Sequence, residues 1–352
     1  MQSESHPEIA VLTDVSARLG RNPLLVQAAS GNTSVKLDGV LWIKASGKWL
    51  ARAGQEEMFV PVDLEEMRKG VAHGLDLARV RSSVGQNLRP SIETAMHAVI
   101  PHRATIHVHS VNAIAWAVRK DGRERCAERL AGLEWQWIPY VSSGLPLAHA
   151  AQKSLARSPR AQVLVLANHG LVVCGDDVLA AEELLQEVEK RLYIQPRETP
   201  APSTALLEQA IIGSDWRLPD RDVVHALGTD TISRAILQAG ILYPCQAIFL
   251  GDRVPMWPVS MPPAREVRGQ LRQATAPGFI VVEDRGVILS KALNGAAREM
   301  LHGLAEVIQR LDSQANLRYL TGAELDLVMN EDAHRYRGLV EQAGNRAHRA
   351  SA

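Results

Sequence analysis

The sequence predicts an α/β protein built as two domains, and three observations lead to this prediction. Segments that favour strands, such as the β-branched run at residues 104–109, alternate with segments of helical periodicity, such as residues 9–19. Residues 196–204 contain three prolines and no apolar run, which is typical of a linker. A chain of 352 residues with 46% hydrophobic content is long enough to bury two cores. The predicted division is 1–195 for the first domain, 196–204 for the linker and 205–352 for a smaller C-terminal α/β domain.

Composition excludes several classes of partner. The 39 basic and 39 acidic residues leave no net charge to attract nucleic acid or an anionic membrane. The three cysteines lie far apart without a CxxC pair, which favours free thiols in a reducing compartment. The first eight residues are polar rather than a signal peptide, and no apolar run approaches the length of a membrane span. We therefore expect a cytoplasmic protein that binds neither nucleic acid nor a membrane.

In the first domain, the helix at residues 9–19 precedes two strands, 31–37 and 40–44, joined by a hairpin turn at Asp38-Gly39. A helix opened by Pro90 is predicted from Ser91 to Val99, with Glu93 in its first turn. The remaining predicted helices of this domain are 64–74, 110–118, 122–130, 147–157 and 177–193, and the remaining predicted strands are 104–109, 135–140 and 163–170.

In the C-terminal domain, the pattern predicts helices at 230–239 and 296–311, a strand at 247–250, and two paired strands at 279–282 and 286–290. Thr321 and Glu324 have the spacing of a capping box at the start of a last helix. No metal, nucleotide or nucleophile motif is evident here, so a structural or assembly role is expected.

Three histidines are the strongest functional signal. His107 and His109 are two positions apart in a predicted strand, so their side chains share a face while Val108 points to the other. His169 follows a second buried strand. Three neutral imidazoles with an open coordination position suit a catalytic Zn²⁺ or a similar borderline metal. From spacing alone, the alternative that each is an ordinary core or surface histidine stays open.

Other candidate positions can also be explained by a purely structural role. A carboxylate at a helix start, such as that of Glu93, interacts favourably with the helix dipole whether or not it has a further role. The turns around Asn32 and around Ser46-Gly47 contain small residues that let a backbone approach an anion, but such residues are common in any turn. His97 and His102 lie outside the strand pattern, so we do not expect them to bind the metal.

Five motifs in order resemble the class II aldolase/adducin family across the first two hundred residues. They are Gly31-Asn32-Thr33-Ser34, Lys44-Ala45-Ser46-Gly47, Ser91-x-Glu93, His107-x-His109 and Asn168-His169-Gly170. Residues 89–109 look most like the aldolase portion of bifunctional rhamnulose-phosphate aldolase/lactaldehyde dehydrogenase proteins.

The resemblance implies a three-layer α/β/α sandwich with a central antiparallel sheet. It also implies a metal-dependent aldolase, a lyase of carbohydrate metabolism, that cleaves or forms a carbon–carbon bond in a ketose phosphate or related hydroxy-keto compound through a metal-stabilised enediolate. His107, His109 and His169 would bind a divalent metal, with Zn²⁺ favoured over Mn²⁺ or another ion. Glu93 would be the catalytic acid/base.

The same resemblance implies that the phosphate of the substrate would contact Asn32, Ser46, Gly47 and Ser91. The chain departs from the fuculose-phosphate aldolases, which have two serines before the glutamate and a threonine in the second loop; here Ile92 and Lys44 stand instead, and Lys44 offers a compensating charge.

Family members usually form homo-oligomers, most often tetramers, and take a proton-donating tyrosine from a neighbouring subunit. Tyr140 lies in a Pro-Tyr pair seen in the family, but no motif assigns it that role. An epimerase, dehydratase or decarboxylase using the same metal site, and a non-catalytic adducin-like scaffold, are the alternatives.

Overall fold

The computed structural model describes residues 6–80, 88–258, 278–329, 336 and 338–340. The chain divides into two compact units, the first made of residues 1–193 and 330–352 and the second of residues 194–329. The sequence-based division placed residues 330–352 with the C-terminal domain. Within the first unit, the Tyr336 hydroxyl donates a hydrogen bond to the Ala29 carbonyl at 3.1 Å.

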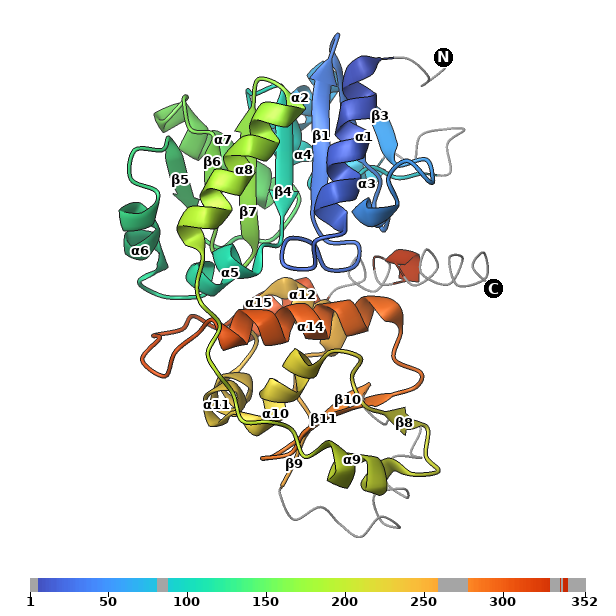
Figure 1. Ribbon diagram of the computed structural model, residues 1–352. Helices are drawn as coiled ribbons and strands as arrows, with labels where there is room; N and C mark the ends of the chain where they lie inside the picture. Colours follow the sequence, from blue (N-terminus) through green and yellow to red (C-terminus); the bar gives the residue numbers. More distant parts are fainter. Residues whose placement is uncertain (1–5, 81–87, 259–277, 330–335, 337, 341–352) are drawn as a thin grey trace. The chain divides into compact units, whose positions relative to one another are not determined.

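A seven-stranded sheet forms the centre of the first unit (Figure 1). Its strands run in the order β3-β2-β1-β4-β7-β6-β5, and all neighbours are antiparallel except β5 and β6. The strands are β1 Asn32–Leu37, β2 Val40–Lys44, β3 Phe59–Asp63, β4 Ala104–Val108, β5 Trp135–Ile138, β6 Val163–Leu166 and β7 Gly170–Gly175. The predicted α/β fold with a mainly antiparallel central sheet is confirmed.

Helices cover both faces of this sheet, as Figure 1 shows. On one face lie α1 (Pro7–Gly20) and α8 (Val178–Leu192), which contact each other. On the other face α2 (Leu64–Ala72), α4 (Thr94–Val99) and α7 (Leu145–Arg157) pack together over a large apolar core. The shorter helices of this unit are η1 Leu50–Arg52, α3 Leu77–Val80, α5 Val111–Ala117 and α6 Gly122–Arg129.

The pairing of β4 with β7 decides which way the polar residues of β4 point. His107 pairs with Val172 and Thr105 pairs with Cys174, and both β7 residues belong to the core beneath α4. Cross-strand partners share a face, so His107 also faces α4. The strand therefore presents its first histidine to the side that carries Glu93.

Helix α4 begins later than predicted. The pattern placed its start at Ser91, whereas the helix begins at Thr94 and Glu93 occupies the N-cap position. The Ser91 hydroxyl accepts a hydrogen bond from the Glu93 backbone N–H at 3.3 Å, and the Thr94 hydroxyl donates to the Ser91 carbonyl at 2.6 Å. Such local side-chain bonds compete with helical ones and hold residues 91–93 in a turn.

The second unit contains a four-stranded sheet in the order β8-β11-β10-β9. Its strands are β8 Trp216–Arg217, β9 Met256–Trp257, β10 Phe279–Val282 and β11 Gly286–Ser290. Its helices are α9 Thr204–Ile211, η2 Asp222–His225, α10 Ala226–Thr229, α11 Thr231–Ala239, α12 Pro244–Leu250, α14 Gly295–Gln309 and α15 Gly322–Val328. The predicted pair of strands and the capping box of Thr321 and Glu324 are both present.

The strand predicted at 247–250 is wrong, because these residues lie in helix α12. A short apolar run does not distinguish a strand from a buried helix. The residues at its two ends indicate a helix: Pro244 stands at the start of α12, and Gly251 ends it with a φ of 94°.

Candidate metal centre

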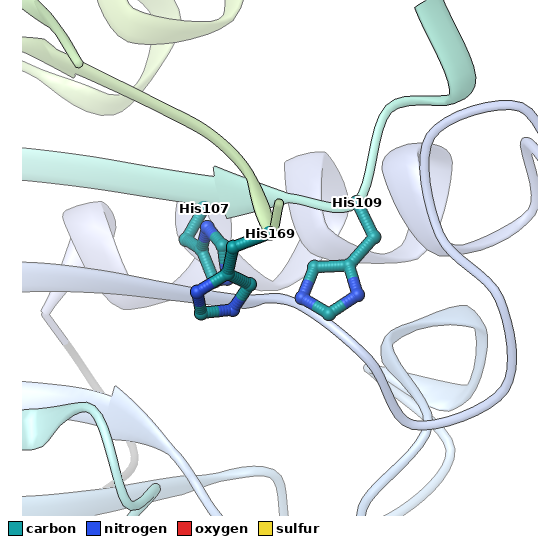
Figure 2. A group of neighbouring side chains, drawn as sticks. All are labelled: His107, His109 and His169. Atoms are coloured by element: carbon teal, nitrogen blue, oxygen red, sulfur yellow. The ribbon is translucent and has the colours of Figure 1, made fainter. Parts of the chain in front are cut away.

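Two neighbouring strands and a tight turn bring three histidines together (Figure 2). His107 lies in β4, His109 follows two residues later, and His169 lies in the short connection between β6 and β7. Asn168, just before His169, has a φ of 50°, a left-handed conformation that asparagine adopts more readily than most residues. This turn directs the His169 ring toward the end of β4.

The three imidazoles form a compact buried group. Each pair of ring centroids is 5.0 to 5.1 Å apart, and one ligand nitrogen from each histidine lies within 4.8 Å of the others. Their exposed fractions are 0% for His107, 5% for His109 and 6% for His169. The triad is consistent with a divalent metal site, and spacing alone did not establish that the third histidine joins the other two.

Hydrogen bonding fixes the tautomer of His107. Its Nδ1 lies 3.0 Å from the Leu171 carbonyl oxygen, which can only accept, so Nδ1 carries the hydrogen and Nε2 carries the lone pair. Nε2 is buried and has no hydrogen-bond partner among the described residues. A buried acceptor without a donor is costly unless it has another partner, which a metal ion provides.

Burial favours the neutral forms of His107 and His109. Loss of hydration lowers the pKa of His107, and Glu93 opposes this only in part. Burial, together with His107 and His169, holds the pKa of His109 well below its usual range. Neutral imidazoles have the lone pair that a metal requires.

Glu93 lies against this group. Its Oε1 is 3.2 Å from His169 Nε2, and its Oε2 is 3.4 Å from His107 Nε2. Burial alone would raise the pKa of this carboxyl, but the neighbouring imidazoles, His107 first, hold the pKa well below the usual value. These contacts favour the ionised form of the Glu93 carboxyl.

Two further side chains hold the carboxylate of Glu93. Asn32 Nδ2 donates a hydrogen bond to Oε2 at 2.7 Å, and Ser143 Oγ donates to Oε1 at 3.3 Å. Sequence reasoning did not single out Ser143, which lies in the loop between β5 and α7. A serine before a glycine is an ordinary loop sequence, so no local signal marked it.

Of the four residues predicted to contact a phosphate, Asn32 and Ser91 contact each other and Glu93. Asn32 Nδ2 also donates to Ser91 Oγ at 3.1 Å, and the Ser46 N–H donates to the Arg89 carbonyl at 2.8 Å. Gly47 follows with a φ of 77°. The amide nitrogen of Asn32 is thus already bonded within the protein, whereas the Ser91 hydroxyl accepts the Asn32 bond and keeps its own hydrogen to donate.

Lys44 is buried, and its side chain forms hydrogen bonds with backbone carbonyls. Its ammonium donates to the carbonyls of Ala29 at 2.7 Å and Gly31 at 2.9 Å. Burial lowers the pKa of Lys44 to about 7, although the charge of Glu93 acts in the opposite direction. In this structure the lysine supports the turn before Asn32.

The other histidines near the triad have different partners. His97 Nδ1 lies 2.7 Å from the Ser34 hydroxyl, and burial lowers the pKa of His97 to about 3. His102 Nε2 lies 3.0 Å from the Ala161 carbonyl. Neither residue belongs to the ligand group.

Fold and site together define a mixed α/β domain with a buried three-histidine centre. The sequence model described as the class II aldolase and adducin N-terminal domain matches residues 11–195, more than half of the chain. The chain belongs to this family.

Two curated proteins are similar to the first part of the chain. The "Uncharacterized oxidoreductase YuxG" of Bacillus subtilis (strain 168) is 27% identical over 199 residues, which cover 51% of this chain and 28% of that protein. The methylthioribulose-1-phosphate dehydratase of Microcystis aeruginosa (strain NIES-843 / IAM M-2473) is 30% identical over 179 residues, which cover 46% of this chain and 81% of that protein. The chain thus spans less than a third of the length of the first relative.

Solved structures also resemble the chain. The N-terminal class II aldolase domain of a conserved protein from Thermoplasma acidophilum has 22% identity and a TM-score of 0.47, and the match covers 55% of this chain and 95% of that one. An L-fuculose-1-phosphate aldolase from Thermus thermophilus has 20% identity and a TM-score of 0.39, with 53% of this chain and 92% of that one covered.

Among the helices that the structure describes, none combines the length and the apolar character needed to cross a membrane.

Proposed function

We propose that this protein is a metal-dependent lyase of the class II aldolase type, acting on a ketose phosphate or a related hydroxy-keto compound. One observation carries the proposal: the buried carboxylate of Glu93 lies 3.2 to 3.4 Å from the Nε2 atoms of two members of a buried three-histidine group. A metal site with a positioned base directly beside it supplies the two parts that such chemistry needs.

His107, His109 and His169 would hold the metal, with Zn²⁺ favoured and Mn²⁺ as the alternative. When bound, the metal supplies a Lewis acid that polarises substrate oxygens and stabilises negative charge on them. The protein's own part is to present neutral nitrogens. The hydrogen bond from His107 Nδ1 to Leu171 does this for the first ligand.

Glu93 would act as the acid/base. Because its carboxylate is ionised and held by Asn32 and Ser143, it can accept a proton from the substrate without first reorienting. Ser46, Gly47 and Ser91 would receive the anionic end of the substrate, with the Ser91 hydroxyl as a donor.

A dehydratase is the second candidate, favoured by the similarity to the methylthioribulose-1-phosphate dehydratase over 81% of that protein's length. The same carboxylate could remove a proton next to a carbonyl in that reaction. A non-catalytic scaffold is less well supported, since a scaffold has no need of three converging imidazoles and an ionised carboxylate.

Metal analysis tests the proposal first. Wild-type protein should contain about one divalent ion per chain, the His107→Ala/His109→Ala double variant should contain none, and Glu93→Gln should keep the metal. Wild-type protein that takes up no zinc or manganese would overturn the proposal.

Product analysis on a panel of sugar phosphates then separates the two reactions. Carbon–carbon cleavage gives two shorter products, whereas dehydration gives one product that lacks a water. Glu93→Gln should lose turnover of whichever substrate reacts, by a factor of about 10² or more. Full activity in Glu93→Gln would remove this residue from the proposed role.

We further propose a homo-oligomer, with a tetramer favoured, in the cytoplasm. Sedimentation analysis of the purified chain tests the assembly. A monomer at micromolar concentration would contradict it.

A further inference from the structure

The two oxygens of Glu93 have chemically different neighbours. Oε2 receives the amide nitrogen of Asn32 at 2.7 Å, and Oε1 receives the hydroxyl of Ser143 at 3.3 Å. The amide cannot be turned around, because its oxygen would then face the ionised carboxylate at the same distance. Asn32 therefore always donates to Oε2.

The histidines do not compete for these positions once a metal is bound. The lone pair of His107 Nε2 would then point at the metal, so this nitrogen could not donate to Glu93. His169 Nε2 lies 3.2 Å from Oε1, and it too could not donate to Glu93 if it bound the metal through this nitrogen. Asn32 and Ser143 would then be the observed donors that still contact the carboxylate. This step rests on the proposed function.

Each of these donors holds one oxygen of the carboxylate, Asn32 the Oε2 atom and Ser143 the Oε1 atom. The two hydrogen bonds together fix the orientation of the carboxylate plane.

We propose that Ser143 is a positioning residue for Glu93. Its hydroxyl holds Oε1 while the Asn32 amide holds Oε2, so that the carboxylate is presented to the substrate in one orientation.

The loop that carries Ser143 is constrained. Gly144 has a φ of 86°, and a Cβ there would lie 3.0 Å from Asp76 Oδ2. Helix α7 begins at the next residue. Ser142, one position earlier, is also half-buried and has no hydrogen bond to Glu93 within this described loop. It offers a matched control.

Kinetics give the first test, with Ser143→Ala, Ser143→Thr and Ser142→Ala. Losing one hydrogen bond to a charged group costs about 1.5 to 3 kcal/mol, so kcat of Ser143→Ala should fall about 10- to 100-fold. KM and metal content should stay unchanged, Ser143→Thr should recover most of kcat, and Ser142→Ala should match wild type. An unchanged kcat in Ser143→Ala would overturn the proposal.

An infrared measurement does not depend on turnover. In metal-free protein labelled with ¹³C-glutamate, the carboxylate band that disappears in Glu93→Gln belongs to Glu93. Ser143→Ala should shift that band and Ser142→Ala should not. If the band stays in place in Ser143→Ala, the role of Ser143 is overturned, even if no substrate is found. If the band shifts but the wild-type protein has no activity, only the proposed reaction is contradicted.

Discussion

Gly170 lies directly behind the histidine group and leaves no room for a side chain. A Cβ at this position would lie 2.6 Å from the Val108 carbonyl oxygen, 3.3 Å from His107 Cε1 and 3.4 Å from His109 Cδ2. The backbone of β4 cannot move away without breaking its pairing with β7. Gly170 therefore sets how closely the two strands, and the ligands on them, approach.

Gly170→Ala should displace β4 and two of the three ligands, although it changes no ligand. We expect metal affinity to fall at least tenfold, as it does when residues that hold the metal ligands are substituted. The overpacking should also lower the free energy of unfolding by about 1 to 3 kcal/mol. Calorimetric titration with zinc and denaturation in urea measure the two effects.

Gly322→Ala is the control for this substitution, since a Cβ there meets nothing within 4 Å. It should leave both metal affinity and stability near the wild-type values. Wild-type zinc affinity in Gly170→Ala would show that the strands adapt and that the close approach is not required.

At single positions, the sequence predicted most of this site for a physical reason. Alternation along a strand placed His107 and His109 on one face without knowledge of the fold. The approach of His169 depends on the pairing of β4 with β7, and the contact of Ser143 depends on a loop that packs from another part of the chain. Neither of these two contacts produces a recognisable pattern in the neighbouring sequence.

Among the elements, strand β2 ends in a lysine that burial makes sensitive to pH. The pKa of Lys44 is lowered to about 7 in the folded protein from an ordinary value of 10.5. Between these two values the unfolded chain binds a proton that the folded chain does not. Stability contributed by this group therefore rises with pH across that window and is lost as pH falls toward 7.

Lys44→Met removes this dependence. The difference in unfolding free energy, wild type minus Lys44→Met, should increase from about pH 7 to about pH 10. Urea denaturation at several pH values measures it. Lys153→Met, on the exposed surface of α7, is the control and should leave the pH dependence of stability as in wild type. Parallel curves for wild type and Lys44→Met would contradict the expectation.

Element boundaries show where periodicity fails. The prediction for α4 began at Ser91 because a residue after Pro90 commonly starts a helix, but hydrogen bonds of Ser91 and Thr94 keep residues 91–93 in a turn. That turn places Glu93 at the N-cap of the helix rather than within its first turn. The residue that we propose as the acid/base thus lies where the helix-start rule failed.

At the scale of the whole molecule, the chain consists of two compact units, and the histidine group lies entirely within the first. The three cysteines are buried and none is in a disulfide, as the absence of CxxC pairs predicted. Composition and spacing can indicate a linker. They cannot show that Tyr336 contacts Ala29, because that contact depends on the tertiary structure.

Metal binding should therefore stabilise one unit and not the other. A ligand present at about 100 times its dissociation constant adds about 2.7 kcal/mol to the state that binds it, which is roughly 5 to 10 °C for a unit of this size. Scanning calorimetry of the full chain should show two transitions, of which zinc raises one. The His107→Ala/His109→Ala double variant should show the same two transitions and no shift, which assigns the responsive transition to residues 1–193. If zinc raised both transitions together in wild type, the units would unfold as one cooperative body, and the metal's effect would extend beyond the unit that holds its ligands.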